Sequence, residues 1–379
     1  MPFKLLKTST LALCCAFGTL PALSSAAADT ASHQISPASP FDTFTPRPSR
    51  TTSLNYDAYD MLLSKTVLYT GPATRRRADR PQPTAGSHFI VGHTSPYRME
   101  GNKLAFAALD GGHLAAFTEL RQVLQTIAAE NDIASFSHNE QLAFWINLHN
   151  VSVIEQIALA YPKRTPSKIK VGPKTADGKR AVLHEAKFIR IGGLALSPRD
   201  IREKIVYPNW PDPVVAYGFF LGDIGSPSLK DRAYTGENVN AQLAENAREF
   251  TNALRGFHKR GDTGMVSRIY QDMAPFYFKD YEADLRAHLT AYMDDDVAAE
   301  LAEMRSLKAA RYEDAIADLS GGTRMPASIA GTTVEGRRLG GTGANAYVRE
   351  LAEKRRLLIK QGKIVPGQGI VTIKDKPTN

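Results

Sequence analysis

The sequence predicts an α+β fold, with a helix-rich single core domain and a small β-sheet that includes a hairpin. Two observations indicate this class. Apolar residues recur at helical spacing through 112–130 and 137–161, and the period changes to strand-like alternation at 187–197. The composition of the two ends differs from that of the middle of the chain. We therefore expect four parts: a signal peptide at 1–28, a largely disordered leader with a short helix at 29–100, the core domain at 101–320, and a basic C-terminal extension at 321–379.

The N-terminal segment has the order of an export signal. Lys4 and Lys7 precede an apolar run at 11–20, and small residues crowd positions 24–28. The run is shorter than the roughly 20 apolar residues of a retained membrane helix. Both cysteines of the chain lie inside it, in contexts that fit a lipoprotein cleavage box poorly. We therefore expect a periplasmic or secreted protein whose mature chain has no thiol and no transmembrane segment.

The basic charge is concentrated near the C-terminus. The chain has a formal net charge of +8, and from 324 to 379 there are 11 Lys and Arg against 4 Asp and Glu. The core is therefore close to neutral, which argues against a nucleic-acid partner. A helix expected at 344–360 carries Tyr347, Leu351 and Leu358 on one side. It would lie on an anionic surface, dock on its own domain or on an envelope protein, or leave the tail solvated.

The helix expected at 137–161 has the clearest boundaries. Ser137 and Glu140 occupy capping-box positions, in which the two side chains satisfy free backbone N–H groups, and Pro162 ends the helix. Apolar residues occupy nearly every face, which predicts a central position. Further helices are expected, in chain order, at 56–66, 112–130, 238–257, 281–292 and 296–304.

A short β region is expected between the helices. A Gly-Gly pair interrupts the alternation of 187–197, which predicts a hairpin with a two-residue turn. Ser197 and Pro198 then form a helix start. The apolar run 214–221 predicts a buried strand, and the loop 222–229 that follows it contains two glycines and a proline.

Four sequence blocks carry a family resemblance. They are 141–150 (QLAFWINLHN), 193–205 (GLALSPRDIREKI), 225–254 with its Ser-Pro-x-Leu and Ala-Tyr-Thr motifs, and 312–319 (YEDAIADL). In this order and spacing they resemble the uncharacterised family known as domain of unknown function 547, which occurs in bacterial exported proteins and in plants. The resemblance covers 105–319 and implies a fold for the core, while the family has no assigned activity.

The chain departs from the family pattern at three places. The family loop that commonly reads Ser-Cys-Pro is Gly-Ser-Pro here, at 225–227. The family's His-Phe-Ala-Leu is Ala-Tyr-Gly-Phe at 216–219, and its Ile-Glu-His is Ile-Arg-Glu at 201–203. A cysteine and two histidines are thus replaced. Any thiol chemistry of the family would be lost in this member, because a hydroxyl cannot replace a thiolate without a nearby base.

Five residues form the candidate binding or loop site. Ser226 is a candidate nucleophile or a simple loop serine, and Asp223 is a candidate acid, cation ligand or turn residue. Asn147 and Asn150 share one helix face, where they would bind a ligand or hold an adjacent loop. Trp145, beside them, is expected in the core.

The sequence leaves two function hypotheses open. The histidines are scattered without a metal-binding motif, so we predict no metal site and no cofactor. The leading hypothesis is a non-catalytic binding or scaffold role in the cell envelope. The alternative is a hydrolase or acyl-transfer enzyme whose site lies at the 222–228 loop and the Asn147/Asn150 helix face.

Overall fold

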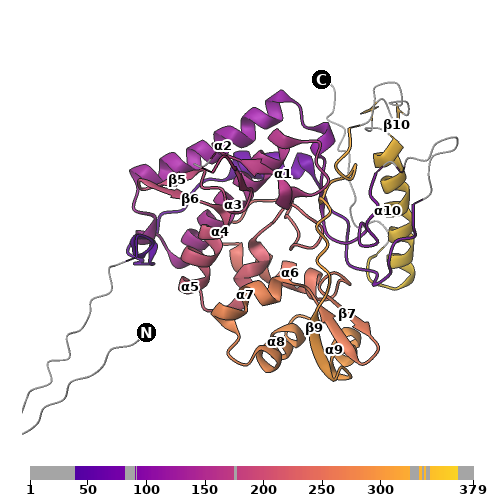
Figure 1. Cartoon of the computed structure of the whole chain (residues 1–379). Helices are drawn as coiled ribbons and strands as arrows, with labels where there is room; N and C mark the ends of the chain where they lie inside the picture. Colours follow the sequence, from indigo (N-terminus) through magenta and orange to yellow (C-terminus); the bar gives the residue numbers. More distant parts are fainter. Residues whose placement is uncertain are drawn as a thin grey trace, which may run out of the picture. The chain divides into compact units, whose positions relative to one another are not determined.

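A computed structural model describes residues 39–81, 90, 92–174, 177–324, 333–334, 337–338 and 342–365 (Figure 1). The expected signal peptide lies outside the described residues. The described residues from 40 onward belong to one compact unit. This unit is a helix-rich α+β domain with several small sheets, as the sequence predicts.

The α-helices of this unit differ greatly in length. In chain order they are α1 (Asp57–Thr66), α2 (Gly111–Glu130), α3 (His138–Ala160), α4 (Pro198–Asp200), α5 (Tyr207–Asn209), α6 (Val239–Thr251), α7 (Ile269–Tyr277), α8 (Tyr281–Thr290), α9 (Asp295–Ala302) and α10 (Thr342–Lys360). A π-helical turn, Ile201–Val206, joins α4 to α5.

The strands are short and pair mostly with near neighbours in the chain. They are β1 (Val67–Leu68), β2 (Lys103–Leu104), β3 (Lys170–Val171), β4 (Ala181–Val182), β5 (Ile189–Ile191), β6 (Leu194–Leu196), β7 (Phe257–Arg260), β8 (Thr263–Val266), β9 (Ser306–Ala309), β10 (Thr333–Val334) and β11 (Arg337–Arg338). The predicted hairpin is the β5–β6 pair, in which Ile191 stands opposite Leu194 across the two-glycine turn. The sheet β7–β8–β9, with β9 parallel to β8, was not predicted.

Helix α3 is the centre of the domain, as its apolar pattern predicts. It packs along α2, and its residues are buried from Glu140 to Glu155. The Ser137 hydroxyl caps the helix by accepting the N–H of Glu140 at 3.3 Å. The reciprocal half of the capping box is not made. The Glu140 carboxylate instead accepts the N–H groups of Leu54 and Gly236, each at 3.1 Å, so it ties two distant loops to the helix start.

The described part of the expected leader packs on the core instead of standing apart from it. Tyr59 and Leu63 of α1 are buried in the main hydrophobic cluster. Phe44 meets Trp145 edge to face, with ring centroids 5.1 Å apart. Residues 40–68 therefore contribute apolar surface to the same core as α3.

The buried strand predicted at 214–221 is not present. Residues Pro213–Gly218 form a 3₁₀ helix, η6, and the following residues run past α3 as irregular backbone. Gly218 packs so closely that a Cβ there would lie 2.7 Å from Ile146 Cδ1. An apolar run of this length is expected for a buried strand and for a buried turn of helix alike, so the prediction chose the wrong one.

The helix expected at 238–257 ends early, because α6 stops at Thr251. A Cβ at Gly256 would collide with the carbonyl oxygen of Phe250, so the chain passes close to the helix end at this glycine. Phe257 then begins β7 and is fully buried. Its apolar side chain continued the helical pattern in the sequence but belongs to the sheet.

Helix α10 docks on the same unit and lies beside the segment between α1 and β2 (Figure 1). Tyr347, Leu351 and Leu358 are buried. Arg98 donates two hydrogen bonds of 2.8 Å to the carboxylate of Glu350. The sequence left several alternatives open for this helix, and the structure shows that it docks on its own domain.

Candidate functional site

The predicted catalytic loop is closed. Ser226 is buried, and its hydroxyl donates to the carbonyl of Asp223 at 2.8 Å and accepts the N–H of Leu221 at 3.2 Å. All its hydrogen-bond partners among the described residues are backbone groups. The side chain thus closes its own turn, and the structure places no His or Lys side chain in hydrogen-bond contact with it.

The Asp223 side chain is hydrogen-bonded to a tyrosine that lies 89 positions later in the chain. The Tyr312 hydroxyl donates to its carboxylate at 2.7 Å. Burial raises the pKa of Asp223 to about 7, although the Tyr312 hydrogen bond opposes the shift. The N–H of Ile224 and the carbonyl of Gly222 bond to the backbone of 315–317, which covers the loop as a strand would. Tyr312 belongs to the 312–319 block, so this block packs directly on the loop.

The two asparagines of α3 hold backbone that has no strand partner. Asn147 donates to the carbonyl of Tyr234 at 2.7 Å and accepts its N–H at 3.1 Å. Asn150 donates to the carbonyl of Gly218 at 2.9 Å and accepts the N–H of Phe220 at 3.0 Å. Each amide thus makes the pair of bonds that a neighbouring strand would make, which is how irregular backbone is accommodated in the core.

A histidine and an arginine extend this network. Arg202 donates to Nε2 of His149 at 2.7 Å, and Nδ1 of the same ring lies 3.0 Å from Oδ1 of Asn150. Burial lowers the pKa of His149 well below its usual value, and the Arg202 charge adds to the effect. The imidazole is therefore neutral with its proton on Nδ1. Arg202 stands in the Ile-Arg-Glu departure, so the substituted position takes part in the packing of α3.

The five predicted site residues therefore fall into separate places. Asn150 and Ser226 bind the neighbouring residues Phe220 and Leu221, whereas Asn147 binds the 234 loop. Trp145 is fully buried between Phe44 and Phe144. All five side chains lie in the interior.

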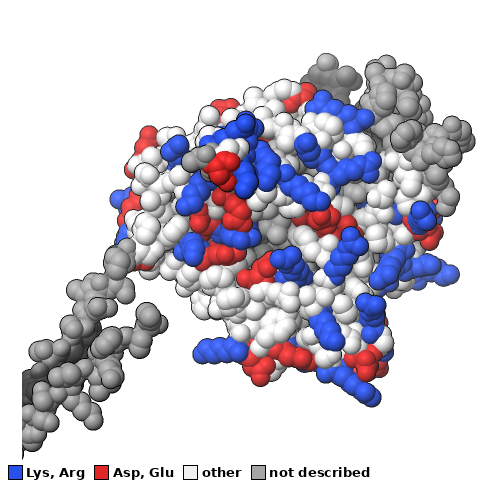
Figure 2. Space-filling view, viewed as in Figure 1, with Lys and Arg blue, Asp and Glu red and all other residues white. Residues whose placement is uncertain are grey.

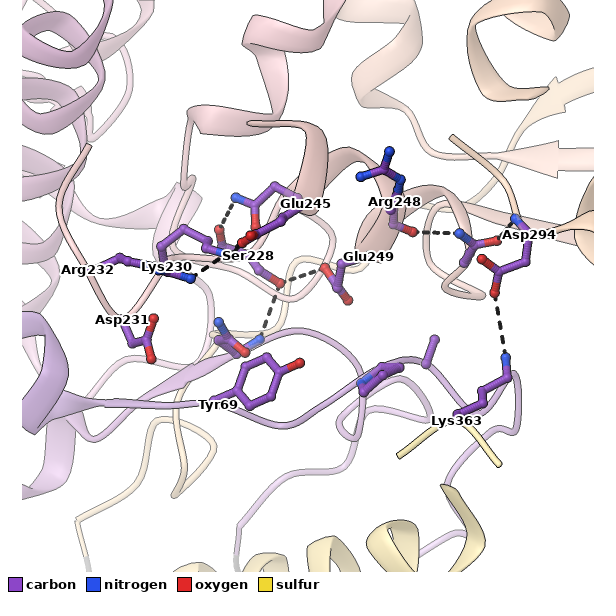
Figure 3. Close-up of a pocket in the computed structure, with 15 residues that line it drawn as sticks. Tyr69, Ser228, Lys230, Asp231, Arg232, Glu245, Arg248, Glu249, Asp294 and Lys363 are labelled. Atoms are coloured by element: carbon purple, nitrogen blue, oxygen red, sulfur yellow. Dashed lines mark hydrogen bonds and ion pairs between the residues drawn. The ribbon is translucent and has the colours of Figure 1, made fainter. Parts of the chain in front are cut away.

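An open cavity lies elsewhere, on the outer side of α6. It has a volume of about 530 Å³ and is lined by the segment 69–73, the loop 228–232, the face of α6 that carries Glu245 and Glu249, and Asn102, Asn252, Asp294 and Lys363 (Figure 3). The sequence does not predict this site, because its walls come from parts of the chain that lie far apart in sequence. The one local signal was the i, i+4 spacing of Glu245 and Glu249 on a helix.

Charges of both signs line the cavity. At one end Glu245 pairs with Lys230 at 2.7 Å and with Arg232 at 3.6 Å. The Lys230 hydrogen bond lowers the pKa of Glu245, so this carboxylate is ionised at neutral pH. At the other end Lys363, just beyond α10, lies 3.8 Å from Asp294. Lysine pairs at such partly exposed sites are weak and exchange easily with a ligand.

A buried ionic cluster supports the cavity floor. Arg255 donates to both oxygens of Glu249, at 2.8 and 2.5 Å, and to the hydroxyl of Ser228 at 3.1 Å. Although burial acts to raise it, the pKa of Glu249 is lowered because Arg255 is so close. Glu100 accepts the backbone N–H groups of Leu254 and Arg255. The cluster fixes the orientation of Glu249 and Ser228 at the cavity surface.

Two buried lysines lie next to this cluster. Lys103 donates to the carbonyls of Glu100 and Gly101, and Lys354 of α10 donates to the carbonyl of Met99 at 2.7 Å. Burial lowers the pKa of both, that of Lys354 to about 8. Helix α10 is thereby attached to the backbone that leads into the cavity wall at Asn102.

The fold so described is an α+β domain centred on α3, with a closed Asp223–Ser226 loop and an open charged cavity beside α6. Residues 133–251 match the family model described as Protein of unknown function, DUF547. The match confirms the resemblance for this stretch, which runs from the turn before α3 to the last residue of α6. No curated protein and no solved structure matches the chain.

The matched stretch 133–251 supplies only part of the cavity lining. Lys230, Arg232, Glu245 and Glu249 lie inside the matched stretch, whereas Tyr69, Asn102, Asp294 and Lys363 lie outside it. Among the described helices, none is both long and apolar enough to cross a membrane. In the same part of the chain, no group of three or more His, Cys, Asp and Glu side chains is arranged to hold a metal ion.

Proposed function

We propose that this protein has a non-catalytic binding role, with the cavity beside α6 as its ligand site. One observation carries the proposal: the cavity is open and charged, whereas the polar groups of the Asp223–Ser226 loop are buried and bonded to one another. A nucleophilic serine needs a base within hydrogen-bond reach, and the partners of Ser226 in the described chain are backbone groups.

The lining points to a ligand that carries charges of both signs along its length. Lys230 and Arg232 stand at one end of the cavity with Glu245, and Asp294 and Lys363 stand at the other (Figure 3). The volume lies in the range of pockets that hold molecules the size of a short peptide. Short peptides of mixed charge, or peptide-bearing fragments of envelope polymers, have the chemistry that this lining would recognise.

Asp231 and Arg248 are the expected anchors for the ligand. Both line the cavity, and neither forms a salt bridge with another residue in the described part of the chain. Their charges are therefore available without breaking an existing pair. Tyr69, which keeps 49% of its surface exposed, offers an aromatic surface in the wall of the same cavity.

Calorimetric titration with the tripeptide Lys-Ala-Glu tests the proposal, with Ala-Ala-Ala as the matched uncharged probe. We expect Lys-Ala-Glu to bind more tightly, and Arg248→Ala and Asp231→Asn each to weaken it about five- to tenfold, since charged hydrogen bonds at a partly exposed site contribute modestly. Lys279→Ala, on an exposed loop, is the control variant. Equal binding of both peptides, or equal binding by all variants, would contradict the assignment of the cavity.

The enzyme hypothesis has its own test. Ser226→Ala and Asp223→Asn remove the two groups that a hydrolase or acyl-transfer site in this loop would use. Under the binding proposal, turnover of ester and peptide substrates by the purified protein stays at the background rate in the wild type and both variants. A wild-type rate above background that either substitution abolishes would establish catalysis at the loop.

We also propose that the protein reaches the envelope through cleavage of its first 28 residues, on the charge and apolar pattern of that segment. Cell fractionation with mass spectrometry of the purified chain tests this. The expected result is a periplasmic or secreted protein whose N-terminus follows Ala26 or Ala28. An intact chain that begins at residue 1 in the cytoplasm would overturn the proposal.

A further inference from the structure

The second concentration of positive charge lies outside the tail and inside the folded core. Residues 162–187 contain eight Lys and Arg against two Asp and Glu, a balance of +6. Since 324–379 holds +7 of the whole-chain +8, the remaining chain is net acidic. All eight cations are exposed; they are Lys163, Arg164, Lys168, Lys170, Lys174, Lys179, Arg180 and Lys187. On the face shown in Figure 2, Lys and Arg gather most densely in the upper part, and the lower part mixes both signs.

The β3–β4 pair presents these charges on one side. Val171 pairs with Ala181, and its buried side chain points inward. Lys170 points the opposite way because successive side chains alternate along a strand. One step beyond the Val171–Ala181 pair, Arg180 falls on the same outward face as Lys170 and is likewise exposed. We call the exposed side of residues 163–174 and 177–180 the basic hairpin face.

The acidic residues of this segment do not neutralise the basic hairpin face. Glu185 binds Arg199 at 2.8 Å, and Asp177 lies 3.5 Å from Lys179. Within the described chain, the other cations of the face form no salt bridge. Arg324 adds a further exposed cation, because its guanidinium lies 5.8 Å from the centre of the Tyr161 ring at the start of the segment.

The face is held rigidly on the core. The carbonyl of Arg164 accepts the N–H of Ile316 at 2.9 Å, and the carbonyl of Ile169 accepts the N–H of Leu183 at 2.8 Å. Gly322 packs against the carbonyl of Lys163 so closely that a Cβ would collide with it. The backbone that carries these cations is therefore held in place on the core.

An exposed apolar side chain lies shortly before the face in the chain. Leu159, in the last turn of α3 and four residues before Lys163, keeps 56% of its surface exposed. This combination strengthens binding to anionic membranes, because cations bind the headgroups and an apolar side chain enters the boundary of the acyl chains. Binding to a soluble acidic polymer would be strengthened by the cations alone.

We propose that the basic hairpin face is a peripheral docking surface for anionic lipid headgroups, with Leu159 as its apolar contact. The surface is separate from the cavity beside α6, so its test is independent of ligand binding there. It is also distinct from the tail, whose helix α10 already buries its apolar side against the core. Docking would hold the protein on a membrane surface without a spanning helix.

Vesicle sedimentation of the purified protein tests this, with phosphatidylcholine vesicles against vesicles that contain about one third phosphatidylglycerol, at low salt. The key variant is K168E/K170E/R180E. Two control variants carry the same charge change, K65E/R260E/K279E on other exposed positions and R349E/R356E/K360E on α10. Thermal melts verify folding, which exposed substitutions of this kind leave nearly unchanged.

The expected result is binding to the anionic vesicles only, weakened at least about a hundredfold by the hairpin variant, since each cation near such a surface strengthens binding about fivefold. Leu159→Ser should weaken it several-fold, and the first control should bind as the wild type does. No preference for anionic vesicles, or loss in the α10 variant with retention in the hairpin variant, would overturn the proposal. Equally tight binding of soluble polyphosphate, with no effect of Leu159→Ser, would reassign the face to an acidic polymer and overturn it as well.

Discussion

Replacing Arg255 with Met removes the cation that neutralises Glu249 while keeping most of the side-chain volume. Arg255 exposes 1% of its side chain, and both oxygens of the Glu249 carboxylate accept its hydrogen bonds. Loss of one partner from a buried ion pair destabilises a protein by about 3–5 kcal/mol. Glu249 keeps 19% of its side chain exposed to the cavity, so we expect a loss at the lower end, about 3 kcal/mol.

The loss depends on pH in a defined direction. In the native protein the pKa of Glu249 lies below its ordinary value of 4.5, so the pair contributes stability above pH 4.5 that is lost as the pH falls through the folded value. In Arg255→Met the carboxyl is desolvated without its cation, so its pKa should rise and the folded protein should bind a proton. The variant is therefore closest to the wild type near pH 4 and loses most at pH 7.

Urea unfolding of both proteins at several pH values measures these differences as changes in the midpoint at constant slope. The double variant Arg255→Met with Glu249→Gln is the matched control, because it leaves no uncompensated charge and should recover much of the loss at pH 7. A single-variant loss below about 1 kcal/mol that does not change between pH 4 and 7 would refute the electrostatic account of this cluster.

Three further predictions concern the core around α3. Asn150→Ala leaves the buried backbone groups of Gly218 and Phe220 without partners, and should cost about 2–4 kcal/mol in urea unfolding. Gly218→Ala places a Cβ 2.7 Å from Ile146 and should cost about 1–3 kcal/mol, whereas Gly111→Ala, which meets open space, should change stability by less than about 0.5 kcal/mol. Because burial raises the pKa of Asp223 to about 7 from 3.8, this carboxyl contributes stability that is lost as the pH rises from 4 to 7, so the stability of Asp223→Asn should fall less than that of the wild type over this range; equal changes in the two proteins would refute the raised pKa.

The structure shows what two residues do at the places where the sequence departs from the expected family pattern. Arg202, at the middle of Ile-Arg-Glu, donates to His149, and its charge adds to the burial that lowers the pKa of that imidazole. Ser226, in the Gly-Ser-Pro loop, bonds to backbone on both sides. These positions in this chain are occupied by groups that complete hydrogen bonds of the interior. This supports the placing of the proposed ligand site in the cavity beside α6 and away from the loop.

Local patterns predicted the elements whose signals are local. The α3 cap at Ser137, the β5–β6 turn and the helix start at Ser197 depend on residues three or fewer positions apart, and the structure has all three. The wrong strand at 214–221 shows the limit of such patterns. Its backbone is satisfied by the side chains of Asn150 and Asn246, which lie far away in the chain, so no feature of the run itself distinguishes it from a strand.

By itself, the sequence determined the fold class, the central helix and the stretch that resembles the family, because periodicity and short motifs act over a few residues. Only the tertiary structure decided where the charges meet. The cavity unites Tyr69, Glu245, Asp294 and Lys363, and the ionic cluster below it joins Glu100 to Arg255. Electrostatic contacts act through space over a few ångströms, so residues that are separated by more than two hundred positions share one site without leaving a mark on the local pattern.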